Sequence, residues 1–226
     1  MKKLAPKHSL PTRLFHWLNV PLLAVMIWSG VLIYWANDIY KIRIGEITIV
    51  DFFPETFYQT LSVGHRLAEG MAIHFTFMWV FALNGMLYVA YTIWSGDWRH
   101  LAPNRQTVAE AWQVVRHDLG LRKEPLPRRK FNGAQRLAYT GVMLMGAGSL
   151  ITGLAIFRPV QHSWLTRLLG GYPLARLEHF ALTIGYVVFL FIHLAQVARA
   201  GWNNFRAMVI GVEIAKDEEG SYGSSD

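Results

Sequence analysis

The sequence predicts an all-α integral membrane protein, a bundle of four transmembrane helices with its N- and C-termini in the cytoplasm. The 226 residues are 53% hydrophobic and only 16% charged, with a mean hydropathy of +0.23. Four stretches of 20 to 27 residues contain no Asp, Glu, Lys or Arg. Each is long enough to cross the ~30 Å hydrocarbon core of a bilayer as a helix.

The helices are expected within one domain, 1–212, followed by a polar and disordered tail, 213–226. The apolar run that begins the first helix is too long for a signal-peptide core and lacks a cleavage site, so it is expected to be retained. The third helix is rich in glycine, which lets another helix or a flat cofactor approach its backbone. No internal repeat is expected. The predicted helices cover about 14–36, 68–95, 135–157 and 174–200.

Two of the connecting loops carry recognisable patterns. In the outer loop 37–64, the segment KIRIGEITIV alternates apolar and polar residues, which predicts a short strand-like or interfacial piece. In the cytoplasmic loop, an amphipathic turn from Thr107 to Leu119 is expected to lie on the membrane surface. The basic run RKEPLPRRK that follows is expected to bind anionic membrane lipid.

The net charge of +7 and the pI near 9.8 are explained by membrane topology. Sixteen Lys and Arg residues fall in the termini and the middle loop, against six in the other two loops. The positive-inside rule therefore places both termini in the cytoplasm of a bacterial inner membrane, and we expect no nucleic-acid binding. The absence of cysteine excludes disulfides, thiolate-bound iron–sulfur clusters and covalently attached haem.

Four histidines lie at matching depths in the predicted bundle. His179 and His193, on the fourth helix, are fourteen residues apart, which is close to four turns, so both leave nearly the same face about 21 Å apart. His16 lies at the cytoplasmic end of the first helix and His74 in the outer half of the second. On antiparallel helices, His16 therefore lies level with His193, and His74 with His179.

His65 is the alternative to His74 as the histidine that is paired with His179. The two are nine residues apart, or two and a half turns, so only one can face the centre of the bundle. We choose His74 because it lies inside the charge-free stretch. A single membrane histidine is often a hydrogen-bonded packing residue, but ionisable groups at this depth are costly and usually functional.

Two histidines at each level suit haem better than a bare metal ion. A zinc ion would lack its third and fourth ligands, since no carboxylate or cysteine lies at these depths. Haem supplies four nitrogens and needs only two axial ligands. Iron with two histidine ligands has no open position, which favours electron transfer. Two haems at two depths would conduct electrons across the membrane.

The chain resembles the prokaryotic di-haem b-type cytochromes of the cytochrome b561 type. These are membrane subunits of hydrogenases, formate dehydrogenases, thiosulfate reductases and related molybdopterin enzymes of respiratory chains. The segments that carry the resemblance are RLFHWLN, IHFTFMWVFALNGMLYVAY, FNGAQRLAY, EHFALTIGYVVFLFIHLAQV and NNFRAMVIG.

The resemblance implies two b-type haems. His16 and His193 would ligate the inner haem, and His74 and His179 the outer haem. It also implies a quinone site near the inner haem, where FNGAQRLAY begins the third helix. There Asn132 and Gln135 would bond a quinone carbonyl and Gly133 would let the ring approach, or Asn132 would simply cap the helix; the two roles are compatible.

The expected function is transmembrane electron transfer between the quinone pool and a periplasmic redox partner, such as a molybdopterin oxidoreductase or a hydrogenase. In that case the chain is the electron-transfer subunit of an oxidoreductase complex, and the long outer loop is a candidate docking surface. The alternative is a stand-alone quinone-coupled cytochrome that reacts with a small species such as superoxide at an outer pocket of Arg158, Arg167 and Arg176. A transporter or channel would need a polar path, yet no acidic residue lies within a predicted span.

Overall fold

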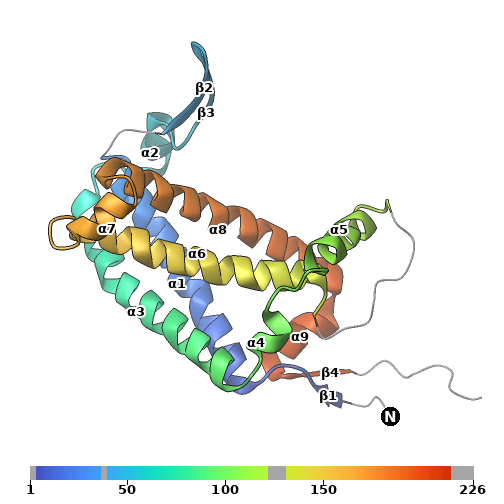
Figure 1. Cartoon of the computed structure of the whole chain (residues 1–226). Helices are drawn as coiled ribbons and strands as arrows, with labels where there is room; N and C mark the ends of the chain where they lie inside the picture. The colour runs from blue at the N-terminus through green and yellow to red at the C-terminus, as the bar shows by residue number, and fades with distance from the viewer. Residues whose placement is uncertain (1–3, 37–39, 122–130, 215–226) are drawn as a thin grey trace, which may run out of the picture. The chain divides into compact units, whose positions relative to one another are not determined.

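Four long apolar helices form the membrane-spanning part of the chain, as predicted (Figure 1). The computed structural model describes residues 4–36, 40–121 and 131–214, so the basic run 122–130 lies outside the described residues. The first helix begins earlier than predicted, because Pro11 is compatible with a first helical turn. The four helices are α1 (Leu10–Tyr34), α3 (Leu67–Trp94), α6 (Gly133–Phe157) and α8 (Tyr172–Ala200).

Short elements connect and flank these spans. The predicted strand-like piece in the loop 37–64 forms a hairpin of two strands, β2 and β3. The amphipathic turn predicted from Thr107 to Leu119 forms the helix α5. The short helices are α2 (Glu55–Leu61), α4 (Trp98–Leu101), α5 (Thr107–Asp118), α7 (Ser163–Leu168) and α9 (Trp202–Ile210). The strands are β1 (Leu4–Pro6), β2 (Lys41–Ile44), β3 (Ile47–Asp51) and β4 (Val212–Ile214).

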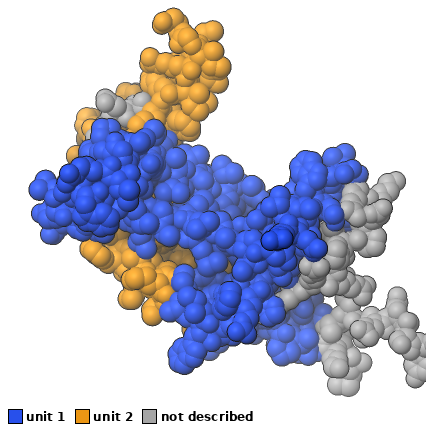
Figure 2. Space-filling view, in the orientation of Figure 1, with its two compact units in different colours: residues 1–13, 88–226 blue, residues 14–87 orange. Residues whose placement is uncertain are grey.

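The chain divides into two compact units (Figure 2). We call residues 14–87 the α1–α3 unit, since they hold most of these two helices and the hairpin between them. Residues 1–13 and 88–226 form the second unit, which we call the α6–α8 unit.

In the α1–α3 unit, the two long helices run antiparallel and approach closely at Gly70. A Cβ atom on Gly70 would lie 2.7 Å from Cβ of Leu32 and 3.1 Å from the carbonyl oxygen of Ser29, so only glycine fits this contact. At the other end of the pair, the Asn84 side chain donates a hydrogen bond to Oδ1 of Asn19 at 2.9 Å.

The hairpin β2–β3 extends from the end of the α1–α3 unit where α1 ends and α3 begins (Figure 1). Gly45, with a φ of 58°, forms its turn, and an ion pair of 2.9 Å joins Lys41 to Asp51 at its base. The helix α2 contacts α1 through Tyr58, whose hydroxyl donates to the carbonyl of Val31 at 3.2 Å. Burial raises the pKa of Tyr58 above its ordinary value, so this phenol remains a neutral donor.

In the α6–α8 unit, glycines let two antiparallel helices approach each other. A Cβ on Gly148 would lie 3.1 Å from the side chain of Leu182, and one on Gly185 would lie 3.0 Å from the sulfur of Met145. The predicted effect of glycine on helix packing is thereby confirmed for α6. At one end of this pair, α7 covers α6 and α8 through a buried cluster of Ala155, Leu165 and Ala175.

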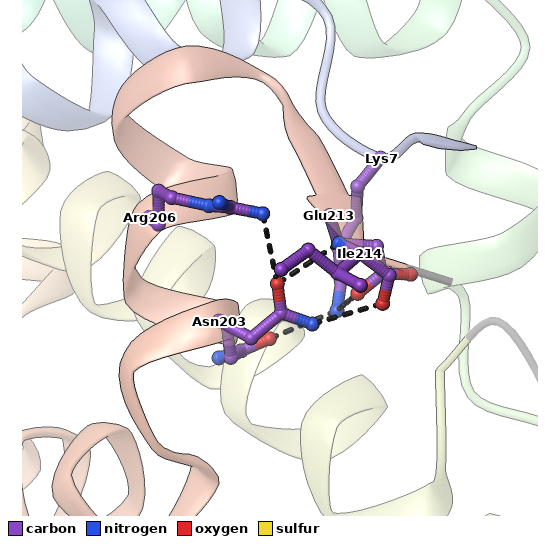
Figure 3. Close-up of polar contacts among 6 residues, drawn as sticks. Lys7, Asn203, Arg206, Glu213 and Ile214 are labelled. Carbon is purple, nitrogen blue, oxygen red and sulfur yellow. Dashed lines mark hydrogen bonds and ion pairs between the residues drawn. The ribbon is translucent and has the colours of Figure 1, made fainter. Parts of the chain in front are cut away.

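The two ends of the described chain are joined in the α6–α8 unit (Figure 3). β1 pairs with β4, and the Lys7 ammonium donates to Glu213 at 2.6 Å and to Asn204 at 2.9 Å. The Asn203 side chain makes two hydrogen bonds with the backbone of Ile214. Residues 213 and 214 are therefore ordered in β4, where the sequence predicted the start of a disordered tail; residues 215–226 lie outside the described part.

Candidate haem-binding histidines

His74 is held by a hydroxyl group from the neighbouring helix. Nδ1 of its ring lies 2.9 Å from Oγ of Ser29, which is on α1. The same hydroxyl donates to the backbone carbonyl of Val25, one turn earlier, at 2.7 Å. Gly30, which follows Ser29, lies beside the ring: a Cβ there would be 3.8 Å from Cε1 of His74.

His179 is held in the same way in the α6–α8 unit. Its Nδ1 lies 2.8 Å from Oγ1 of Thr152 on α6. The Thr152 hydroxyl donates to the carbonyl of Gly148 at 2.7 Å. Gly153 follows, and a Cβ there would lie only 3.3 Å from Cε1 of His179.

These contacts assign the proton on each ring. A hydroxyl has one proton, and a carbonyl oxygen can only accept, so the short bonds to Val25 and Gly148 use the protons of Ser29 and Thr152. The imidazole must then donate from Nδ1. In this tautomer Nε2 carries the lone pair that a metal ligand needs. The side chains of His74 and His179 therefore fit axial ligation of haem iron.

The two histidines of the predicted inner pair lie beside aromatic rings. His193 stacks on Phe189, one turn earlier on α8, with the ring centroids 5.7 Å apart and the planes inclined by 11°. His16 meets the edge of Trp17, with the centroids 5.3 Å apart. His16 belongs to the α1–α3 unit and His193 to the α6–α8 unit, so their pairing remains a prediction.

His65 differs from His74 in its local structure. It lies two residues before α3, with a φ of 61°, in the left-handed region that histidine enters more readily than most residues. Its ring meets the edge of Trp35, with the centroids 4.7 Å apart, and its side chain is exposed. This geometry suits a residue that sets the path of the chain into α3.

The predicted quinone residues form the start of α6. Asn132 and Gln135 make a reciprocal capping box: each side-chain oxygen accepts the other's backbone N–H, at 2.9 and 3.0 Å. The space beside Gly133 is filled by α5, since a Cβ there would lie 2.5 Å from the carbonyl oxygen of Thr107. The structure therefore gives Gly133 a packing role on the side that faces α5, and the approach of a quinone ring to Gly133 stays a prediction.

The three arginines of the predicted outer pocket each have a local contact. The guanidinium groups of Arg158 and Arg176 lie over the rings of Phe157 and Tyr172, at 5.3 and 5.8 Å. Nε of Arg167 donates to the carbonyl of Ser163 at 3.3 Å. Across residues 4–36, 40–121 and 131–214, no three His, Asp or Glu side chains gather as a bare metal site.

Sequence reasoning missed Ser29 and Thr152. A serine or threonine in a membrane helix commonly bonds the carbonyl one turn back, so the hydroxyl alone gave no signal. The signal that could have identified them is that a hydroxyl residue followed by glycine occurs near the end of both α1 and α6, as Ser29-Gly30 and Thr152-Gly153.

Comparison with known proteins identifies the class of this chain. Residues 7–211 match the sequence model of prokaryotic cytochrome b561, so the chain belongs to that family of membrane electron-transfer proteins with b-type haem. It is also 30% identical, over 189 residues, to a protein of Azospira oryzae described as a putative protein-methionine-sulfoxide reductase subunit, YedZ1. The match covers 82% of this chain and 87% of that protein.

Proposed function

We propose that this protein carries electrons across the bacterial inner membrane, between the quinone pool and a periplasmic redox partner, through two haems b. His16 and His193 would ligate the inner haem, and His74 and His179 the outer haem. The hydroxyl-held rings of His74 and His179 are the observation that carries this proposal. The sixteen Lys and Arg of the termini and middle loop support cytoplasmic termini.

Bound haem would supply the one-electron chemistry; the chain supplies the ligands and their orientation. The Nδ1–H groups of His74 and His179 donate hydrogen bonds to the hydroxyls of Ser29 and Thr152, respectively. Each ring would therefore bind iron through Nε2. Two histidine ligands would leave no position for oxygen or substrate, so the bound haem would supply electron transfer alone.

The quinone contact is proposed at Asn132 and Gln135. Their capping box uses the two amide oxygens, while a quinone carbonyl requires donors, which the two amide NH₂ groups supply. Gly133 would contribute indirectly, by letting α5 pack against the start of α6.

This contact can be tested apart from the cap. Asn132→Asp and Gln135→Glu keep the oxygens of the capping box and remove the amide donors. In purified, haem-loaded protein, we expect slower haem reduction by a quinol analogue and unchanged reduction by dithionite. Reduction by quinol at the wild-type rate in both variants would contradict the contact.

The partner is proposed to dock on the hairpin β2–β3. Four isoleucines, Ile42, Ile44, Ile47 and Ile49, are 50 to 70% exposed on it. An isolated two-stranded hairpin is marginal in water, and both of its strands have an unpaired edge. The hairpin extends from the end of the α1–α3 unit that holds His74, where the outer haem would exchange electrons. The relative's description as a reductase subunit supports a partner protein over a lipid surface.

A double substitution tests this docking surface. Ile44→Ser with Ile47→Ser should slow reoxidation of the reduced haems by a periplasmic extract of the source bacterium. Reoxidation by ferricyanide should be unchanged, because a small oxidant needs no docking. The proposal would be contradicted if reoxidation slowed equally with the extract and with ferricyanide, or if it slowed with neither of them.

A further inference from the structure

The two helix pairs carry the same pattern, although no internal repeat was expected. α1 and α6 are each 25 residues long, with Arg13 and Arg136 at the fourth position of their helices. Ser29-Gly30 and Thr152-Gly153 occupy the twentieth and twenty-first positions. The agreement extends to the helix that follows each of them.

His74 and His179 are each the eighth residue of their helix, and a phenylalanine follows each of them. The contacts agree as closely as the positions. Nδ1 lies 2.9 Å from the Ser29 hydroxyl in one pair and 2.8 Å from the Thr152 hydroxyl in the other, and each hydroxyl donates to a carbonyl at 2.7 Å. Two units of the molecule thus build the same arrangement from different residues.

This arrangement affects the ligand as well as its position. A hydroxyl whose proton is engaged elsewhere is a better acceptor, because hydrogen bonds in a chain polarise one another. An imidazole that donates from Nδ1 to such an acceptor becomes a more basic ligand at Nε2. A more basic axial ligand stabilises ferric over ferrous iron and so lowers the reduction potential of a haem.

We infer that Ser29 and Thr152 are positioning residues that fix the tautomer of His74 and His179 and lower the reduction potential of the haem these histidines bind. The inference rests on the proposed function, since it takes both histidines as ligands of one haem. It adds that each hydroxyl would act on that haem through its own histidine, so the two effects should add.

The experiment is a potentiometric titration of detergent-purified, haem-loaded protein, with electron paramagnetic resonance of the oxidised state. In Ser29→Ala and in Thr152→Val, one of the two midpoint potentials should rise while the other stays at its wild-type value. The double variant should raise the same midpoint further. The resonance of one low-spin haem should shift in step, and that of the other should not.

The chain offers matched controls. Ser29→Thr and Thr152→Ser keep the hydroxyl and should restore the wild-type midpoint. Thr92 on α3 also donates to a carbonyl one turn back, at 2.8 Å, and is buried, so Thr92→Val measures the effect of losing such a bond alone. It should leave both midpoints unchanged. If Ser29→Ala is not recovered folded, Ser29→Cys retains a weaker acceptor and should shift the midpoint in the same direction, but less.

Two outcomes would overturn the inference. One is a variant with two haems and wild-type midpoints at both positions; the other is a Thr92→Val protein with the same shift as Ser29→Ala. Failure of the proposed function would look different, because the wild-type protein itself would then lack two haems with paired histidine ligands.

Discussion

His74 and His179 make the same kind of hydrogen bond to a hydroxyl, but the space beside the two rings differs. Beside His74, a Cβ on Gly30 would stand 3.8 Å from the ring, an ordinary van der Waals distance. Beside His179, a Cβ on Gly153 would stand at 3.3 Å, closer than most such contacts. The hydrogen bond therefore sets the tautomer in both units, while packing limits the ring more tightly in the α6–α8 unit.

The reason lies in where each pair of helices comes together. α6 and α8 approach at several glycines, of which Gly148 and Gly153 lie on either side of Thr152 and close to α8. α1 and α3 approach closely at Gly70, one turn before His74, and leave more room beside the ring at Gly30. The same ligand arrangement can thus be reached with different helix packing.

The largest predicted effect is loss of a haem. His74→Ala and His179→Ala should each reduce the haem content from two per chain to one, and they should lose the same haem, because both rings are proposed to bind one iron. The measurement is a pyridine haemochrome assay with a low-temperature reduced-minus-oxidised spectrum. His65→Ala is the control and should keep both haems; loss of one haem there would make His65 the ligand.

The next effect is on stability in the α1–α3 unit. Gly70→Ala places a methyl group 2.7 Å from Cβ of Leu32 and 3.1 Å from the backbone of Ser29, so the helices must separate. Overpacking of this kind costs about 1–3 kcal/mol. The thermal unfolding temperature in detergent should fall. Gly85→Ala on the same helix meets no atom within 4 Å and should not lower it. Equal unfolding temperatures would contradict the close contact at Gly70.

The smallest predicted effect is the difference between alanine substitutions at Gly30 and Gly153, the glycines beside the rings of His74 and His179. Alanine within a helix is ~0.5–1 kcal/mol more favourable than glycine, so Gly30→Ala should keep or slightly raise stability and leave the haem spectrum unchanged. Gly153→Ala should displace the His179 ring by a few tenths of an ångström and shift the α-band of one haem. If the two variants have the same spectrum, the difference in space is not functional.

The sequence predicted most of the fold because the relevant signals are local. A charge-free stretch determines a membrane helix, and each of the four ends within a few residues of its predicted limit. The alternation in KIRIGEITIV predicted a short strand-like or interfacial piece, which the structure shows as two paired strands, and the amphipathic pattern from Thr107 predicted the segment that forms α5. Asn132 was read as a helix cap from its residue type alone, and the capping box with Gln135 confirms that reading.

What could not be predicted depends on the register between distant segments. Ser29 and His74 are 45 residues apart, and no local pattern states that their helices align at these positions. The bond from Lys7 to Glu213 joins residues 206 apart, which is why the sequence did not show that residues 213 and 214 belong to a strand. Nor could the sequence show that the backbone of another helix, α5, packs against Gly133.

The most direct test of the account is the haem content and spectrum of the detergent-purified protein. Pyridine haemochrome analysis should find two haems b per chain, and the reduced-minus-oxidised spectrum should show the sharp α-band of low-spin iron. A single haem per chain, or a high-spin spectrum, would contradict the pairing of His16 with His193 and of His74 with His179.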